Sequence, residues 1–171
     1  MKKFYKVFAF DKKGRFFSLI ASGKARKYYR PNQKSKGKVF RVKGSSKKIQ
    51  NPIYAFDYLR NIYDFLKFTP APLPDKVEIW EVLGEEWRGK PMGIAASSSL
   101  LESGFVDRIV SSSDMHFIDG TVLLSFCIPV RRIKVIELEL VYLLQPQDLT
   151  ISIGQFARKI KTIKESEGKI K

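Results

Sequence analysis

Cysteine and histidine are almost absent from this sequence of 171 residues, which contains one of each, Cys127 and His116. A single cysteine excludes a disulfide within the chain, and the apolar run VLLSFCIP around it predicts a buried, unreactive thiol. One cysteine and one histidine are too few for a zinc site built from these two ligand types. A Ser-His-Asp triad would depend on His116, but no G-x-S-x-G pattern surrounds any serine.

Long apolar runs are absent as well, because charged residues interrupt every hydrophobic stretch well before the ~18 residues that a membrane-spanning helix needs. The first residues, MKKFYKVFAFDKKG, begin with basic residues but contain no apolar segment long enough for a signal peptide. A P-loop and a G-x-G-x-x-G motif are both missing, so no nucleotide cofactor is expected. These absences favour a cytoplasmic or otherwise intracellular protein with no membrane span and no cofactor.

Acidic pairs occur at Glu78 with Glu81 and at Glu137 with Glu139. Paired carboxylates can act as general acid and base or bind a metal ion. Glu137 and Glu139 would share one face of a strand, as residues of a solvated sheet face do, whereas Glu78 and Glu81 would not. We therefore expect neither a catalytic residue nor a metal site. A small nuclease that works without a metal, using Lys, Arg and Tyr, is our third functional hypothesis.

Acidic residues are also nearly absent from residues 1–50, which contain 17 Lys or Arg and one acid, Asp11, while the whole chain has a formal net charge of +15. An ordinary solvated surface mixes charges of both signs. An excess of one sign attracts polyanions and accelerates their association. Nucleic acid is the most common partner of such a basic region.

The most basic stretch is SGKARKYYRPNQKSKGK, from Ser22 to Lys38, with seven Lys or Arg, two tyrosines and no acid. Cations can neutralise phosphates, and a tyrosine can stack on a base of a single strand or of RNA. The alternative is a solvated loop whose tyrosines pack into the core. The predicted nucleic-acid-binding residues are Lys24, Arg26, Lys27, Tyr28, Tyr29, Arg30, Lys34, Lys36, Lys38, Lys47 and Lys48.

Four further residues are candidates for contact with a partner. Trp87 and Arg88 are neighbours in a predicted loop, and both types are common at interface hot spots. Trp87 packed against the core is an equally good interpretation. Arg158 and Lys161 lie on the basic side of a predicted C-terminal helix.

Hydrophobic residues make up 44% of the chain, which is enough for a real core and predicts one domain over 1–171. Residues 1–50 are predicted to form a strongly basic β-hairpin and loop region, and 84–120 a flexible excursion. The hairpin is FYKVFAF, the turn DKKG and then RFFSLIAS. KVFRVK and VEIWEV are further predicted strands. Thr121–Leu144 is predicted to form two or three strands, the first interrupted by Pro129.

Two segments favour helices. NPIYAFDYLRNIYDFLKF is either one helix from Asn51 or, as we prefer, a strand over Ile53–Phe56 and a helix capped by Asp57. Near the C-terminus, Phe156, Ile160 and Ile163 recur at helical spacing after a capping-box pattern. The predicted fold is therefore α+β, a mostly antiparallel sheet with one central short helix and a C-terminal amphipathic helix.

Residues 4–82 resemble a loose class of uncharacterised small phage and prokaryotic proteins. The shared pattern is an aromatic hairpin (FYKVFAF and RFFSLIAS), a tyrosine-containing turn (KYYRP), NPIYAFDYLRNIYDFL leading into a short helix, and VEIWEV as a closing strand. This class has no assigned activity, so the resemblance implies only a viral or mobile-element origin.

Three hypotheses follow from these observations. The first is a non-enzymatic nucleic-acid-binding protein that is largely independent of sequence, with a slight preference for RNA or single-stranded DNA. The second is a protein-interaction module, a virion component or an inhibitor that uses the same basic face against an acidic host or virion protein. The small nuclease is the third.

Overall fold

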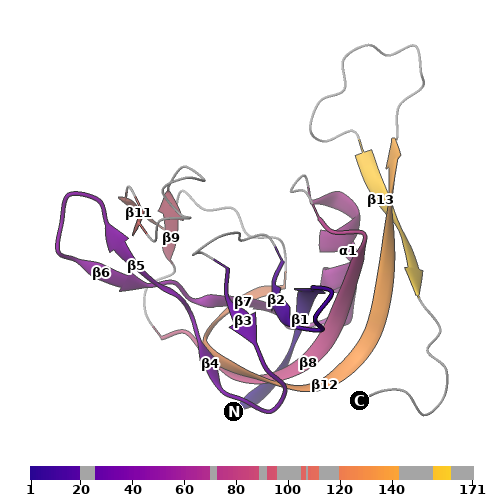
Figure 1. The fold of residues 1–171 in the computed structure, drawn as a ribbon, viewed down its shortest axis with the longest axis horizontal. Helices are drawn as coiled ribbons and strands as arrows, with labels where there is room; N and C mark the ends of the chain where they lie inside the picture. Colours follow the sequence, from indigo (N-terminus) through magenta and orange to yellow (C-terminus); the bar gives the residue numbers. More distant parts are fainter. Residues whose placement is uncertain are drawn as a thin grey trace.

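The computed structural model describes residues 1–19, 26–69, 73–88, 92–95, 105–106, 108–111, 120–142 and 156–162. Most of these residues lie in antiparallel sheet, and one short helix, α1 (Leu59–Phe68), packs against it (Figure 1). The strands are β1 (Lys2–Phe10), β2 (Phe16–Ser18), β3 (Tyr28–Tyr29), β4 (Ser35–Lys36), β5 (Val39–Val42), β6 (Lys48–Gln50), β7 (Ile53–Phe56), β8 (Lys76–Glu86), β9 (Met92–Ala95), β10 (Phe105–Val106), β11 (Arg108–Ser111), β12 (Thr121–Tyr142) and β13 (Phe156–Thr162).

Two long strands, β8 and β12, pair with each other from Lys76 opposite Glu137 to Glu86 opposite Leu124. They curve together along the floor and one side of the molecule (Figure 1). The second edge of β8 pairs with β1, and β7 connects β1 to the start of β12. The pairings β1–β8, β8–β12, β12–β7 and β7–β1 therefore close a ring of strands.

The 22-residue strand β12 corrects our prediction that Pro129 interrupts this segment and divides it into two or three strands. Proline has no backbone N–H to donate to a neighbouring strand, which is why it usually ends a central strand. Here the register with β8 shifts directly after Pro129, and further shifts lie on either side. Such bulges accommodate the missing donor and bend the strand, so the strand continues.

Both faces of the central strands are buried, which gives the protein two hydrophobic clusters. Trp80 and Val82 of β8 face one cluster together with Phe4 and Phe8 of β1. Val77 and Ile79 face the other cluster, which α1 covers with Ile62 and Leu66 at i, i+4 spacing. Alternation along β8 thus separates two apolar sets rather than an apolar set from a polar one.

The segment around α1 confirms the preferred prediction of a strand at Ile53–Phe56 followed by a helix. The predicted cap is wrong, because Tyr58 occupies the N-cap position and no side chain bonds the helix start. None of the helices within the described residues is long and apolar enough to cross a membrane. The predicted hairpin forms between β1 and β2, and KVFRVK contains β5.

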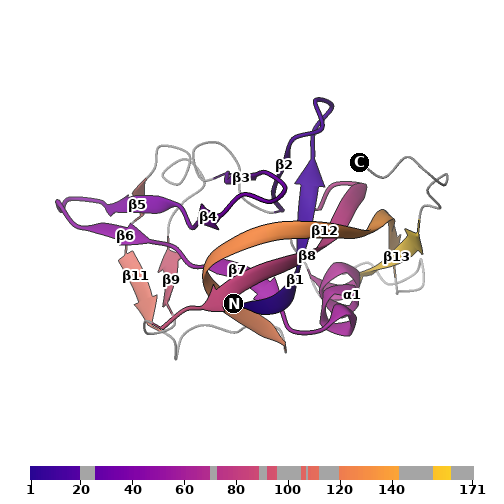
Figure 2. The same cartoon turned by 90° about the horizontal axis from the view of Figure 1, so that it is seen from below.

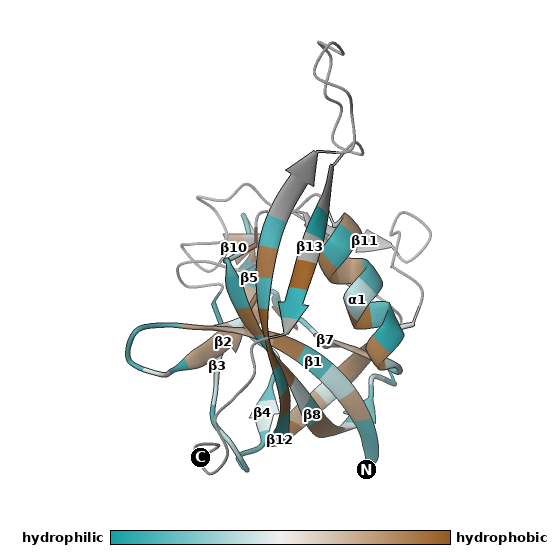
Figure 3. Ribbon diagram, turned by 90° about the vertical axis from the view of Figure 1, so that its right-hand side faces the viewer, coloured by the Kyte–Doolittle hydropathy of each residue, from teal (hydrophilic) through white to brown (hydrophobic). Residues whose placement is uncertain are grey.

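The C-terminal amphipathic helix is wrong, because Phe156–Thr162 forms strand β13 along the free edge of β12. Among the described residues, α1 is the only helix, so the fold class is mostly antiparallel β with a single short helix. A spacing of four residues fits a helix face, but it also fits one face of a strand, because four is a multiple of two. Ile160 lies opposite Leu138, and Lys161 lies opposite Glu137. Figure 3 shows β13 between the end of β12 and α1.

Arg158 of β13 is buried and closes the C-terminal end of α1. Its Nη1 donates to the carbonyl oxygens of Leu66 at 3.3 Å and Thr69 at 2.6 Å. The last carbonyls of a helix have no partners within the helix and need donors from elsewhere. A cation is also favoured there by the helix dipole. Arg158 therefore fixes α1 to the edge of the sheet.

Replacement of Arg158 by Met should lower the free energy of unfolding by about 1–3 kcal/mol, because buried carbonyls lose their donor. Urea unfolding of purified protein measures this change. Lys161→Met is the matched control on the same strand, where an exposed residue is expected to change stability by less than about 0.5 kcal/mol. Equal stabilities for the two variants would show that Arg158 does not hold the helix end.

Candidate nucleic-acid interface

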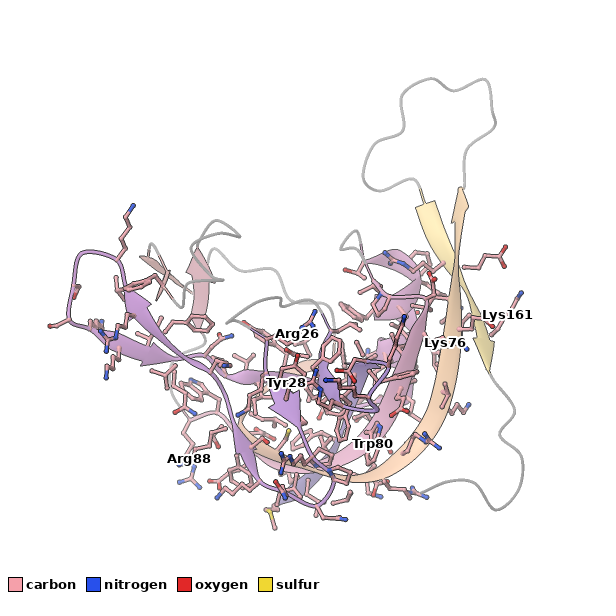
Figure 4. The ribbon with its side chains drawn as sticks, viewed as in Figure 1. Arg26, Tyr28, Lys76, Trp80, Arg88 and Lys161 are labelled. Atoms are coloured by element: carbon pink, nitrogen blue, oxygen red, sulfur yellow. The ribbon has the colours of Figure 1, made fainter. Side chains whose placement is uncertain are left out.

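The β1–β2 hairpin and β3 bring together two aromatic rings and two arginines. The ring of Phe17 meets the ring of Tyr28 edge-on, with centroids 5.7 Å apart. The guanidinium of Arg26 lies 4.0 Å from the centroid of Phe17, and that of Arg15 lies 4.8 Å from the centroid of Tyr28. Arg26 and Tyr28 lie close together near the middle of the molecule (Figure 4). Tyr28 as a whole is 42% exposed, so it can meet a ligand.

The two adjacent tyrosines have different environments. Tyr29 is only 5% exposed, and its ring packs against Phe8 with centroids 4.9 Å apart. Burial raises the pKa of Tyr29 far above its usual value. Neighbouring residues of a strand point to opposite faces, so when Tyr29 enters the core Tyr28 faces outward. Of the two predicted stacking residues, Tyr28 is the one whose ring is open to a base.

A turn and strand β4 display three exposed cations beside β12: Arg30, Lys34 and Lys36. The backbone of this segment is fixed, because Asn32 N donates to Pro129 O at 2.7 Å and β4 pairs with Phe126 and Cys127. The ammonium of Lys34 lies 3.9 Å from the centroid of the Phe126 ring. The turn therefore holds these charges at defined positions on the surface.

Of the remaining predicted binding residues, three lie at the β5–β6 hairpin. Lys47 and Lys48 are exposed, and Lys38 at the root is half-buried. Lys27 is also half-buried, and its backbone N–H donates to Ser18 Oγ. Lys24 lies outside the described residues. Seen in Figure 2, β3, β4 and the β5–β6 hairpin follow one another along one side of the molecule.

The four other candidates contact other parts of the protein. Trp87 is half-buried, and its backbone N–H donates to Leu123 O. Arg88 forms an exposed ion pair with Glu85. Lys161 of β13 lies 3.6 Å from Glu139, and β13 lies at the opposite end of the molecule from the β5–β6 hairpin (Figure 2). Arg158 is buried against α1, so its guanidinium is not presented to a partner.

Carboxylates in the rest of the described structure are largely balanced by nearby cations. Glu81 contacts Arg131 at 2.9 Å and Lys3 at 3.5 Å, and the hydrogen bond from Arg131 lowers the pKa of Glu81. Glu78 contacts Arg132 at 3.1 Å and accepts a hydrogen bond from Trp80. Residues 26–50, by contrast, contain ten Lys or Arg and no acid. The nine that follow Arg26 form no ion pair with a described residue.

Metal-ligating residues and titratable groups with shifted pKa values can be located in the described part of the chain. No three His, Cys, Asp or Glu side chains there gather into a group that could hold a metal ion. His116 lies outside the described residues. Lys6 is buried, and its ammonium donates to Tyr54 O at 2.7 Å. Burial lowers the pKa of Lys6 to about 8 and raises the pKa of Cys127 to about 11. Both groups lie within the core rather than on a substrate-accessible surface.

Comparisons with protein-family models, curated proteins and solved structures find no match to this chain. The resemblance of residues 4–82 to small phage and prokaryotic proteins therefore stays a prediction. Sequence reasoning also missed Arg15 and Phe17 as neighbours of Tyr28. The strand pairing of Phe17 with Tyr28, between β2 and β3, creates that proximity.

Lys6→Met removes a buried ammonium group together with its hydrogen bond to Tyr54 O, so the stability of the variant relative to the wild type should depend on pH. The wild-type pKa of Lys6 is about 8, below the value of about 10.4 expected in the unfolded chain. Between these pH values the unfolded chain binds more protons, so Lys6 contributes a stability that rises with pH. The stability of the variant relative to the wild type should therefore fall by about 3 kcal/mol from pH 8 to pH 10.5.

Chemical unfolding at a series of pH values measures this difference between Lys6→Met and the wild type. Lys2→Met removes an exposed charge from the same strand and controls for charge loss alone. A difference that stays constant from pH 8 to pH 10.5 would mean that the ammonium of Lys6 is hydrated in the native protein.

Proposed function

We propose that this is a non-enzymatic nucleic-acid-binding protein whose affinity is largely independent of sequence. The observation in its favour is the unbalanced charge on β3 to β6, where ten cations and no acid lie in residues 26–50. A folded surface without a binding partner has no need to concentrate repelling charges in this way. A polyanion relieves that repulsion and makes the arrangement favourable.

Binding proceeds by neutralisation of phosphates and release of counterions, which gives affinity without base readout. Arg30, Lys34 and Lys36 act from the turn beside β12, and Lys47 and Lys48 act from the β5–β6 hairpin. Tyr28 adds a ring on which a base of RNA or single-stranded DNA stacks. Arginine can also form two parallel hydrogen bonds to one phosphate, which lysine cannot.

Fluorescence anisotropy with single-stranded RNA, single-stranded DNA and duplex DNA at several salt concentrations tests this function. The triple variant Arg30→Ala, Lys36→Ala, Lys47→Ala should bind every sequence more weakly. For single strands the slope of log K against log salt should become shallower by about 2, at about 0.7 per lost phosphate contact. The oligonucleotides should be intact after the titration.

The matched control is Arg60→Ala, Lys67→Ala, Lys76→Ala, which removes the same charge from exposed positions on α1 and β8. An equal loss of affinity in the control variant would mean that binding depends on net charge and not on these three positions. Cleaved oligonucleotide would instead indicate a nuclease. Wild-type protein that binds no nucleic acid at low salt would reject the proposal, and an acidic protein partner would become the next target.

A further inference from the structure

A three-stranded sheet formed by β10, β5 and β6 lies beside the main sheet. Arg41 of its central strand pairs with Phe105 of β10 on one side and with Lys48 of β6 on the other. Paired residues of adjacent strands have their side chains on the same face of a sheet. Phe105, Arg41 and Lys48 therefore form one row across the three strands.

This row lies on the outer face of the small sheet. Phe105 is 37% exposed, and Arg41 and Lys48 are exposed as well. Phe40, which precedes Arg41, and Ile49, which follows Lys48, are buried and paired with each other on the opposite face. The sheet thus has one face in the protein interior and one aromatic and basic face toward solvent.

Arg41 and Lys48 are held especially close together. Val42 N donates to Lys47 O at 3.0 Å, and Asn51 N donates to Lys38 O at 2.8 Å. Hydrogen-bonded and non-hydrogen-bonded pairs alternate along an antiparallel ladder. The two bonds show that the pair next to Arg41 and Lys48 is hydrogen-bonded, so Arg41 and Lys48 form a non-hydrogen-bonded pair. The side chains of such pairs approach most closely, and like charges there are destabilising.

The segment that carries Arg41 and Lys48 contains no acid of its own, because the chain has no Asp or Glu between Asp11 and Asp57. A bound phosphate would offset their repulsion by contacting both cations. The exposed ring beside them offers a second kind of contact, since every base has an aromatic face that can stack on phenylalanine. Bases of a duplex are already stacked on each other, so this second contact selects single strands.

We propose that Phe105, Arg41 and Lys48 form a binding site for single-stranded nucleic acid. One base stacks on Phe105, and the phosphates next to it contact Arg41 and Lys48. The inference rests on the proposed function and specifies its ligand and its central residues. The sequence alone does not show that Phe105 and Arg41 are neighbours, because they belong to distant segments of the chain.

The root of the β5–β6 hairpin is fixed, so the row is formed before any ligand binds. A side-chain carbon at Gly37 would overlap the carbonyl oxygen of Asn51, so only glycine permits this approach of the two chain segments. Pairing of β10 with β5 holds the other side of the sheet. A preformed site avoids part of the ordering cost of binding.

The test uses two fluorescein-labelled probes of equal length, oligothymidylate and an abasic strand with the same backbone. Phe105→Leu should bind oligothymidylate about 5- to 100-fold more weakly, because one stacking contact is lost. Its affinity for the abasic strand should not change. Phe105→Trp should restore binding, and Phe68→Leu, at a 60% exposed phenylalanine on α1, is the matched control.

A second variant, Arg41→Gln with Lys48→Gln, tests the phosphate contacts. It should weaken binding of both probes and reduce the salt slope by about 1.4, from two lost contacts. The control is Lys67→Gln with Lys76→Gln, which removes two exposed charges elsewhere. Circular dichroism confirms that each variant is folded before its affinity is measured.

The outcomes separate this site from the proposed function. If the wild type binds oligothymidylate but Phe105→Leu binds it as Phe68→Leu does, the site is wrong and the function stands. Duplex DNA that binds more tightly than oligothymidylate, with no effect of Phe105→Leu, also overturns the site. Wild-type protein that binds neither probe overturns the site and the function together.

Discussion

The pairing of β12 with β8 is the interaction on which the remaining structure depends. Because β12 is bent by successive bulges, its length wraps around the molecule instead of forming a flat ladder. One edge of β12 is used by β8, and the other is shared by β7, β4 and β13. The loop that displays Arg30, Lys34 and Lys36 is therefore held by the same strand that closes the ring.

Prediction from the sequence succeeded where local pattern decides the structure and failed where distant pairing decides it. The β1–β2 hairpin, β5 and the change from β7 to α1 follow from turns and periodicity within short windows. The spacing of Phe156 and Ile160 fits a helix and a strand equally, and only the free edge of β12 resolves it. Composition defines the basic region along the chain, but the burial of Arg158 and Tyr29 depends on partners far away in sequence.

The charges on the β8–β12 ladder and the charges on β3 to β6 have different roles. Around the ring, carboxylates such as Glu78 and Glu81 meet arginines across the β8–β12 ladder, which makes this pairing specific in register. Along β3 to β6 the cations have no acidic neighbours in sequence. A ligand that binds only the native state adds its binding free energy to stability. Polyanion binding would thus strengthen the part of the fold that repels itself most.

Ring closure also has a consequence for the order in which the chain becomes structured. Strands β1, β7 and β8 all precede residue 121, yet β8 and β7 obtain their second partner only from β12. During synthesis the basic segment therefore leaves the ribosome long before the strand that completes the sheet. Contacts between such distant segments carry a large loop-closure cost and slow folding. The nascent chain must carry its positive charge past ribosomal RNA while it is still incompletely folded.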